Sequence, residues 1–160
     1  MNRLAFTLKA WPVIALATIG LCFLTKTVAG WLGIDLPDQQ NIDVVRQHLA
    51  HAFDSARRFG MAAFLVAQVV VLMPAAEEMV FRLPTRWLRN WGWFFFFSAL
   101  FAAAHYLAQP WPDAAFLALF FFGLAQCWLY RKTGRLWCTM LNHALFNLTN
   151  LVLLFVLPEA

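Results

Sequence analysis

Long apolar runs separated by short polar connections dominate the pattern of the chain. Each run has a length that suits a helix crossing the roughly 30 Å hydrocarbon core of a bilayer better than a core helix of a soluble domain. The pattern therefore predicts an all-α, polytopic membrane helix bundle with about five transmembrane spans. The runs cover residues 10–24, which is extendable to 34, then 59–76, 91–108, 114–130 and 136–157.

The polar stretch 35–58 has a different pattern, in which apolar residues recur at helical spacing. This spacing is typical of an amphipathic helix lying at the membrane surface. We therefore expect one membrane domain over 1–160, made of an anchor span (1–34), an interfacial helix (35–58) and a helical core (59–157). The recurring residues are Ile42, Val45, Leu49 and Phe53, with Asn41 or Asp43 available as the helix N-cap.

The first run also has features of a secretory signal peptide. It follows Arg3 and Lys9, and it contains the small residues Ala15 and Ala17. Because further apolar runs follow and no clear hydrophilic domain does, we interpret the first run as a retained anchor.

The composition supports lipid as the solvent of this chain. Of the 160 residues, 62% are hydrophobic and 12% are charged, roughly half of the ~25% charged residues usual in soluble domains. The net charge of +4 does not indicate nucleic acid, because the basic residues lie between apolar runs rather than in one patch. Cys22, Cys127 and Cys138 lie inside apolar runs without a CxxC spacing, so we expect neither disulfides nor a cysteine zinc site.

The distribution of charge predicts the orientation in the membrane. With a cytoplasmic N-terminus, eight of the twelve basic residues lie inside and six of the eight acidic residues lie outside. The positive-inside rule therefore favours a multi-pass protein of the cell membrane with its N-terminus in the cytoplasm. The eight basic residues are Arg3, Lys9, Arg82, Arg86, Arg89, Arg131, Lys132 and Arg135.

The two remaining acids, Glu77 and Glu78, lie at the end of an apolar run. Ionisable groups at membrane depth are costly and indicate a functional site. On a helix the two side chains would point about 100° apart, so we do not expect both to face one cavity. Glu78 and Arg82 have the spacing of an ion pair, which would leave Glu77 to take a proton from water. Two glutamates that merely cap a cytoplasmic helix end are the alternative.

His105 is a second polar residue in an apolar run. If the helices are continuous and turn near Trp91, Glu77 and His105 each lie fourteen residues from the turn. At about 1.5 Å per residue, both would lie roughly 20 Å above it and could meet. A packed, hydrogen-bonded histidine is the alternative.

The last run carries His143 and Asn147 four residues apart, with Asn150 continuing the same face. In lipid this stripe needs a polar cavity or a partner helix. Hydrogen bonds between helices would explain it. Together with Glu77 and His105, the stripe would instead make a site that activates water and stabilises an oxyanion. The chain has no GxSxG or HExxH motif, so serine and standard zinc chemistry lack their motifs.

Three short motifs resemble those of the CPBP family, which includes the type II CAAX prenyl endopeptidases and many prokaryotic relatives. They are EExxxR at 77–82, FxxxH at 101–105 and HxxxN at 143–147, and the resemblance covers roughly 59–157. It implies a membrane-embedded, glutamate-dependent endopeptidase without a cofactor, acting on a membrane-associated protein or peptide. The resemblance implies a prenylated CAAX terminus or a C-terminal sorting signal as the substrate, and a prokaryotic inner membrane as the location.

The resemblance also implies roles for individual residues. Glu77 would be the general base and His105 would help to hold the attacking water, while His143 and Asn147 would stabilise the oxyanion. Glu78 and Arg82 would form a supporting ion pair.

Two alternatives stay open. Glu77, His105 and His143 could instead hold a divalent metal such as zinc, because two imidazoles and a carboxylate are a zinc ligand set. The chain could also be a non-catalytic scaffold or immunity-type protein.

Overall fold

The computed structural model describes residues 2–36, 40–88, 90–107 and 113–156, and the side chains of 40–44 are outside this description. Within these ranges the chain is helical and has no strand, as predicted. The elements are α1 (Arg3–Trp31), α2 (Gln40–Ala50), η1 (Ala52–Asp54), α3 (Ala56–Ala67), the π-helix η2 (Gln68–Leu72), α4 (Met73–Phe81), η3 (Leu83–Arg86), α5 (Trp91–Ala104), α6 (Ala115–Thr133) and α7 (Leu136–Val156).

Local sequence signals explain where several helices begin and end. Asn2, Ser55 and Asn90 precede α1, α3 and α5, and the side chain of each accepts a backbone N–H of the first turn. Gly134 ends α6 with a positive φ of 64°, a conformation that glycine adopts without steric cost.

All five predicted apolar runs form helices. Among the described residues, three helical stretches are long and apolar enough to cross a membrane, namely Arg3–Trp31, Ala56–Phe81 and Leu136–Val156. The third run forms α5, a shorter apolar helix of 14 residues, and the fourth forms α6. These findings confirm an all-α membrane helix bundle.

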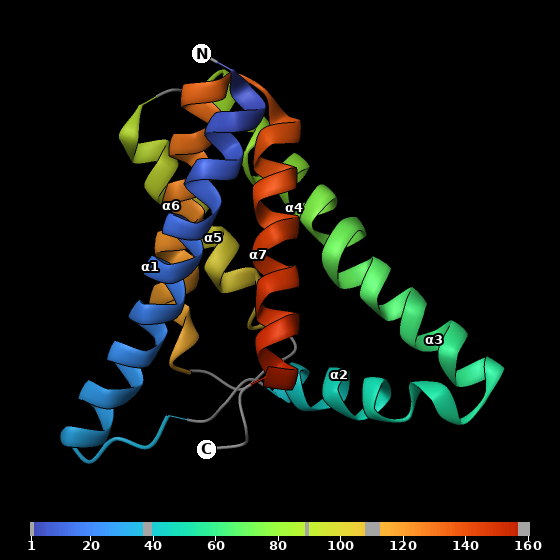
Figure 1. Cartoon of the computed structure of the whole chain (residues 1–160). Coiled ribbons are helices and arrows are strands. Elements are labelled where there is room, and N and C mark those ends of the chain that lie inside the picture. The colour runs from blue at the N-terminus through green and yellow to red at the C-terminus, as the bar shows by residue number, and fades with distance from the viewer. Residues whose placement is uncertain (1, 37–39, 89, 108–112, 157–160) are drawn as a thin grey trace.

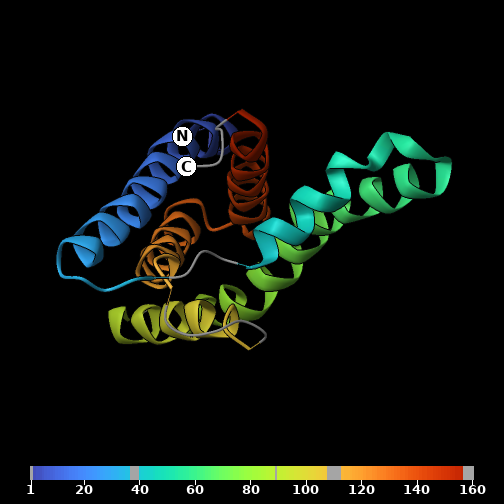
Figure 2. The ribbon, with the colours of Figure 1, turned by 90° about the horizontal axis from the view of Figure 1, so that it is seen from below.

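The bundle is formed by α1, α4, α5, α6 and α7. In Figure 1, α1, α6 and α7 lie side by side with α5 behind them, and α4 packs against α7. α2 and α3 form a hairpin that extends away from the bundle in both views (Figures 1 and 2). The polar stretch thus contains the predicted helix, while its position at the membrane surface stays a prediction.

Two details of the polar stretch differ from expectation. α2 begins at Gln40, so Asn41 and Asp43 lie inside the helix and neither is its N-cap. Phe53 belongs to η1 rather than to the apolar face of α2. The sequence also predicts a short turn at 109–113, because Pro110 and Pro112 lie within it. Of these residues only Asp113 belongs to the described part of the chain.

The helix that carries the two glutamates is shorter than the depth argument assumed. α4 ends at Phe81, and the chain continues as the 3-10 turn η3 rather than as an α-helix through Arg89. Pro84 explains this end, because proline has no N–H to donate and its ring clashes with the preceding turn of an α-helix. The assumption of two continuous helices of equal length is therefore wrong.

The core is aromatic. Phe81, Phe101, Phe122 and Phe146 pack together with Ile14 and bring five helices, α1, α4, α5, α6 and α7, to one centre. α5 and α6 approach closely where Gly123 faces Ser98, and a Cβ added at Gly123 would lie 3.0 Å from the Cβ of Ser98. The Trp11 indole N–H donates to the Thr149 hydroxyl at 3.2 Å and ties α1 to α7.

Candidate active site

Glu78 is the buried acidic centre of the candidate site. Its Oε2 lies 3.4 Å from Nε of Arg82, one helical turn later, and both side chains are fully buried. Its Oε1 lies 3.0 Å from Nδ1 of His143 on α7. The ion pair expected from the spacing of Glu78 and Arg82 is thus present, and a histidine from another helix completes it.

Arg82 is held by more than its acidic partner. Its guanidinium carbon lies 4.8 Å from the centroid of the Phe101 ring, a cation–π geometry. Its side-chain nitrogens make no hydrogen bond within the described part of the chain. The ion pair with Glu78 and the ring of Phe101 therefore provide the electrostatic balance that a buried guanidinium requires.

Glu77 occupies a different environment. Its side chain is 18% exposed, and its Oε2 lies 3.6 Å from Nε2 of His143. Both glutamates therefore approach one imidazole, and the expectation that they face different cavities is wrong. The two nitrogens of His143 lie on different edges of the ring, so side chains that diverge from adjacent positions of α4 can each reach one of them.

Aromatic rings fix the position of His143. The Phe122 ring contacts its imidazole at a centroid distance of 4.9 Å, and the Phe101 ring does so at 5.9 Å. The side chain of His143 is 3% exposed. Packing and two acidic neighbours thus leave this imidazole little freedom to rotate.

His105 lies at the C-terminal end of α5. Its Nδ1 is 2.9 Å from the carbonyl oxygen of Phe101, one turn earlier, and its ring packs against the Phe101 ring at 4.7 Å. Phe101 therefore touches His105, His143 and Arg82. In the sequence, Phe101 is only the first position of the FxxxH motif, and its spacing of four residues from His105 is the one signal of this role.

Asn147 donates a hydrogen bond from Nδ2 to the carbonyl oxygen of Val69, at 2.8 Å. Val69 lies in η2, where the backbone N–H of Met73 bonds to the carbonyl of Gln68, five residues earlier. The next bond of this register would bring the N–H of residue 74 to Val69, but residue 74 is proline and has no N–H. Asn147 thus supplies the donor that Pro74 lacks.

A second polar contact, also unassigned from the sequence, joins α6 to α7. Gln126 donates from Nε2 to Oδ1 of Asn142 at 2.8 Å, and both side chains are buried. Asn142 precedes His143 directly, so this bond fixes the part of α7 that carries the imidazole. Lone polar residues in apolar runs were the available signal, and helix-helix hydrogen bonding explains these two.

The metal alternative has no assembled ligand set among the described residues. No group of three or more His, Cys, Asp or Glu side chains in this part of the chain is arranged to hold a metal ion. The set Glu77, His105 and His143 therefore stays a prediction, which metal analysis of the active protein can test.

The fold and this cluster define a membrane-embedded helix bundle with two glutamates, an arginine and histidines at its centre. The family model of the Rce1-like type II CAAX prenyl endopeptidases matches residues 59–149, which is more than half of the chain. The protein belongs to this family, and so to a family of membrane proteases. The matched range contains all three motifs, and α1 and α2 lie outside it. No curated protein and no solved structure matches the chain.

Proposed function

We propose that this protein is a glutamate-dependent intramembrane endopeptidase that hydrolyses a peptide bond of a membrane-associated protein. The family match supports an endopeptidase of the CAAX type. The difference between the two adjacent glutamates carries the assignment of the base: Glu78 is buried between Arg82 and His143, whereas Glu77 is partly exposed.

A general base needs a lone pair that can reach the proton of a water molecule. Glu78 is poorly suited, because its two oxygens face Arg82 and His143 at 3.4 and 3.0 Å. Glu77 has a single described contact, at 3.6 Å to His143, and retains accessible surface. We therefore assign the base to Glu77 and a supporting role to Glu78 and Arg82.

The proposed reaction uses only residues of this chain. Glu77 takes a proton from a water held with His105, and the water oxygen forms a bond to the scissile carbonyl carbon. His143 and Asn147 donate hydrogen bonds to the resulting oxyanion. The tetrahedral intermediate then collapses, the C–N bond breaks, and the proton passes to the leaving amine.

The contacts of Asn147 are compatible with this role. An asparagine amide has two N–H donors, and the hydrogen bond to Val69 uses one of them. The second donor is left for the oxyanion, and the bond to Val69 limits rotation of the amide. The same residue can therefore support the backbone and take part in the reaction.

Replacement of the base tests the proposal. Glu77→Gln keeps the size of the side chain and removes the proton acceptor, so we expect a loss of at least about 100-fold in the cleavage rate, the lower end of general-base contributions. Membrane fractions of cells expressing the wild type or the variant are compared for new protein N-termini. Asp35→Asn, the same change at an exposed residue, is the matched control.

Thermal unfolding of the purified variant checks that its fold is intact. Full cleavage by a folded Glu77→Gln protein would contradict the assignment of Glu77 as the base, and the absence of cleavage by the wild type would favour a non-catalytic role.

The substrate is proposed at the level of its chemistry. Two probes separate the options: a prenylated peptide ending in a CAAX sequence, and a peptide with an unmodified apolar C-terminal segment of the sorting-signal type. Cleavage of the first alone would assign a prenyl substrate, and cleavage of the second alone would assign a sorting signal.

A further inference from the structure

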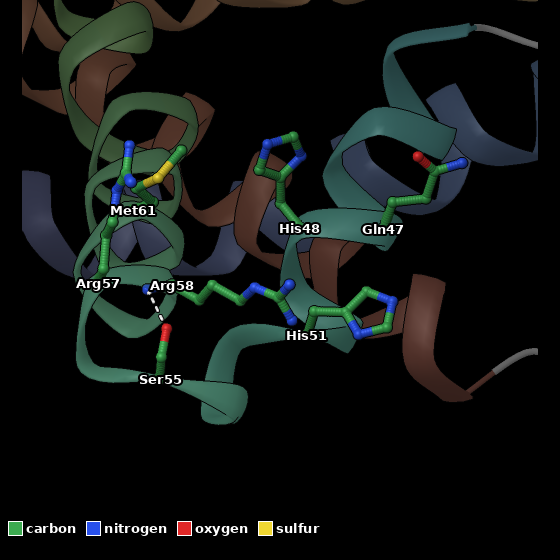
Figure 3. Close-up of a pocket in the computed structure, with 7 residues that line it drawn as sticks. All are labelled: Gln47, His48, His51, Ser55, Arg57, Arg58 and Met61. Carbon is green, nitrogen blue, oxygen red and sulfur yellow. Dashed lines mark hydrogen bonds between the residues drawn. The ribbon is translucent and has the colours of Figure 1, made fainter.

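The hairpin of α2 and α3 encloses an open groove that the proposed reaction does not use. Two adjoining cavities of about 480 and 450 Å³ form it, and they share three lining residues, His48, Arg57 and Met61. In Figure 3 the side chain of His48 projects between the two helices, and Arg57 and Met61 lie together on α3.

One end of the groove is basic. Its lining includes His48, His51, Arg57 and Arg58, and none of the described residues that line either cavity is acidic. Asp54 pairs with Arg58 and His51 outside the lining, and Figure 3 shows Arg58 extending toward His51. Among the described residues, Arg57 makes no ion pair or side-chain hydrogen bond, so its guanidinium retains its full donor capacity.

The other end of the groove is apolar. Met61, Phe64 and Leu65 line it, and the side chain of Phe64 is 64% exposed. Together with Arg57 and Gln68 these residues follow one face of a continuous helical stretch, at spacings of three and four. The groove therefore changes from basic to apolar along a single direction.

The row of residues from Arg57 to Gln68 is about as long as one leaflet of a membrane is thick. From Arg57 to Gln68 the helix advances eleven residues, or about 16 Å at 1.5 Å per residue. Half of a hydrocarbon core of about 30 Å is about 15 Å. This row belongs to the helical stretch Ala56–Phe81, which is apolar and long enough to cross a membrane. A molecule in the groove would thus have its charged end at the interface and its apolar end near the bilayer centre.

We propose that this groove binds an anionic phospholipid. Arg57 and His48 hold the phosphate, because a guanidinium binds phosphate oxygens through paired N–H donors. An acyl chain lies along Met61, Phe64 and Leu65. A small soluble anion would satisfy the basic end alone and leave the apolar end exposed. The site is separate from Glu77, so the proposal does not depend on the catalytic assignment.

The test compares lipids with the same acyl chains and different headgroups. The full chain is purified in detergent and stripped of lipid. Binding of phosphatidylglycerol and of phosphatidylcholine is then measured by native mass spectrometry and by thermal unfolding. We expect tighter binding of phosphatidylglycerol, and about fivefold weaker binding by Arg57→Gln, as for the loss of one basic residue near an anionic surface. Phe64→Ser tests the apolar end and should also weaken binding.

Arg135→Gln is the matched control, because it removes the same charge from an exposed residue between α6 and α7. Three results would overturn the proposal. They are equal binding of the two lipids, unchanged binding by a folded Arg57→Gln protein, and stabilisation by inorganic phosphate as large as that by phosphatidylglycerol. The last result would reduce the groove to a simple anion site.

Discussion

The hydrogen bond from Asn147 to the carbonyl of Val69 predicts that substitutions at positions 74 and 147 have coupled effects on the free energy of unfolding. These two positions are far apart in the sequence. Asn147→Ala removes the only donor described for the Val69 carbonyl. In water this carbonyl could find another partner, but within the bundle it is partly buried and Pro74 cannot serve it. Loss of this hydrogen bond should therefore destabilise the fold, in addition to any effect of Asn147→Ala on the cleavage rate.

The magnitude follows from the desolvation of one carbonyl group. A buried acceptor left without a partner costs about 1–3 kcal/mol, whereas single side-chain hydrogen bonds inside membrane proteins average about 0.6 kcal/mol. Because Asn147 and Val69 are both partly buried, we expect Asn147→Ala to lower the free energy of unfolding by about 1–2 kcal/mol. Asn150→Ala is the matched control, since Asn150 lies on the same helix and makes no side-chain hydrogen bond among the described residues.

A double-mutant cycle with Pro74→Ala isolates the cause. The alanine restores an N–H that Val69 can accept from its own helix, so the bond from Asn147 becomes dispensable. We expect Asn147→Ala to cost about 1 kcal/mol less in the Pro74→Ala background than in the wild type, a coupling within the range measured for contacting residues. Unfolding of the four proteins by SDS in mixed micelles, followed by circular dichroism, measures the four free energies.

The cycle also separates the two roles of Asn147. A part in oxyanion stabilisation affects the cleavage rate but not the unfolding free energy, and Pro74→Ala cannot restore it. Additive destabilisation, with no coupling between positions 74 and 147, would refute the structural explanation. Equal effects of Asn147→Ala and Asn150→Ala would do the same.

Two further predictions concern the packing and charge of the bundle. Gly123→Ala should lower the free energy of unfolding by about 1–3 kcal/mol through overpacking, because the new Cβ would lie 3.0 Å from Ser98; Gly20→Ala, which meets nothing within 4 Å, should not destabilise the protein. Arg82→Leu should cost about 3–5 kcal/mol, because it leaves buried Glu78 without its cationic partner, and adding Glu78→Gln should recover part of that loss. Equal unfolding free energies of Gly123→Ala and Gly20→Ala, or an exposed-site control Arg86→Leu as damaging as Arg82→Leu, would contradict these expectations.

The helices were predictable because apolar runs report directly on burial in lipid. The five runs became α1, the stretch from α3 to α4, α5, α6 and α7. The Glu78–Arg82 ion pair was predictable for a similar reason, since a spacing of four residues brings two side chains of one helix together. Both inferences use only neighbours along the chain.

The remaining features depend on contacts between helices, which spacing does not encode. His143 lies between both glutamates because α7 packs against α4. The bond from Asn147 ends on a backbone carbonyl, a group that every residue carries and that no letter of the sequence distinguishes. Pro74 was the available signal, and it becomes informative only once the π register is known.

The arrangement around His143 also sets a charge count. Two carboxylates and one guanidinium, those of Glu77, Glu78 and Arg82, sum to one negative charge when all are ionised. An isolated net charge is costly inside a membrane, and Glu77→Gln would remove it, because that substitution takes away one of the two carboxylates. The fold would thus hold the proposed base at a cost in stability, and the variant that lacks it should unfold no more easily than the wild type.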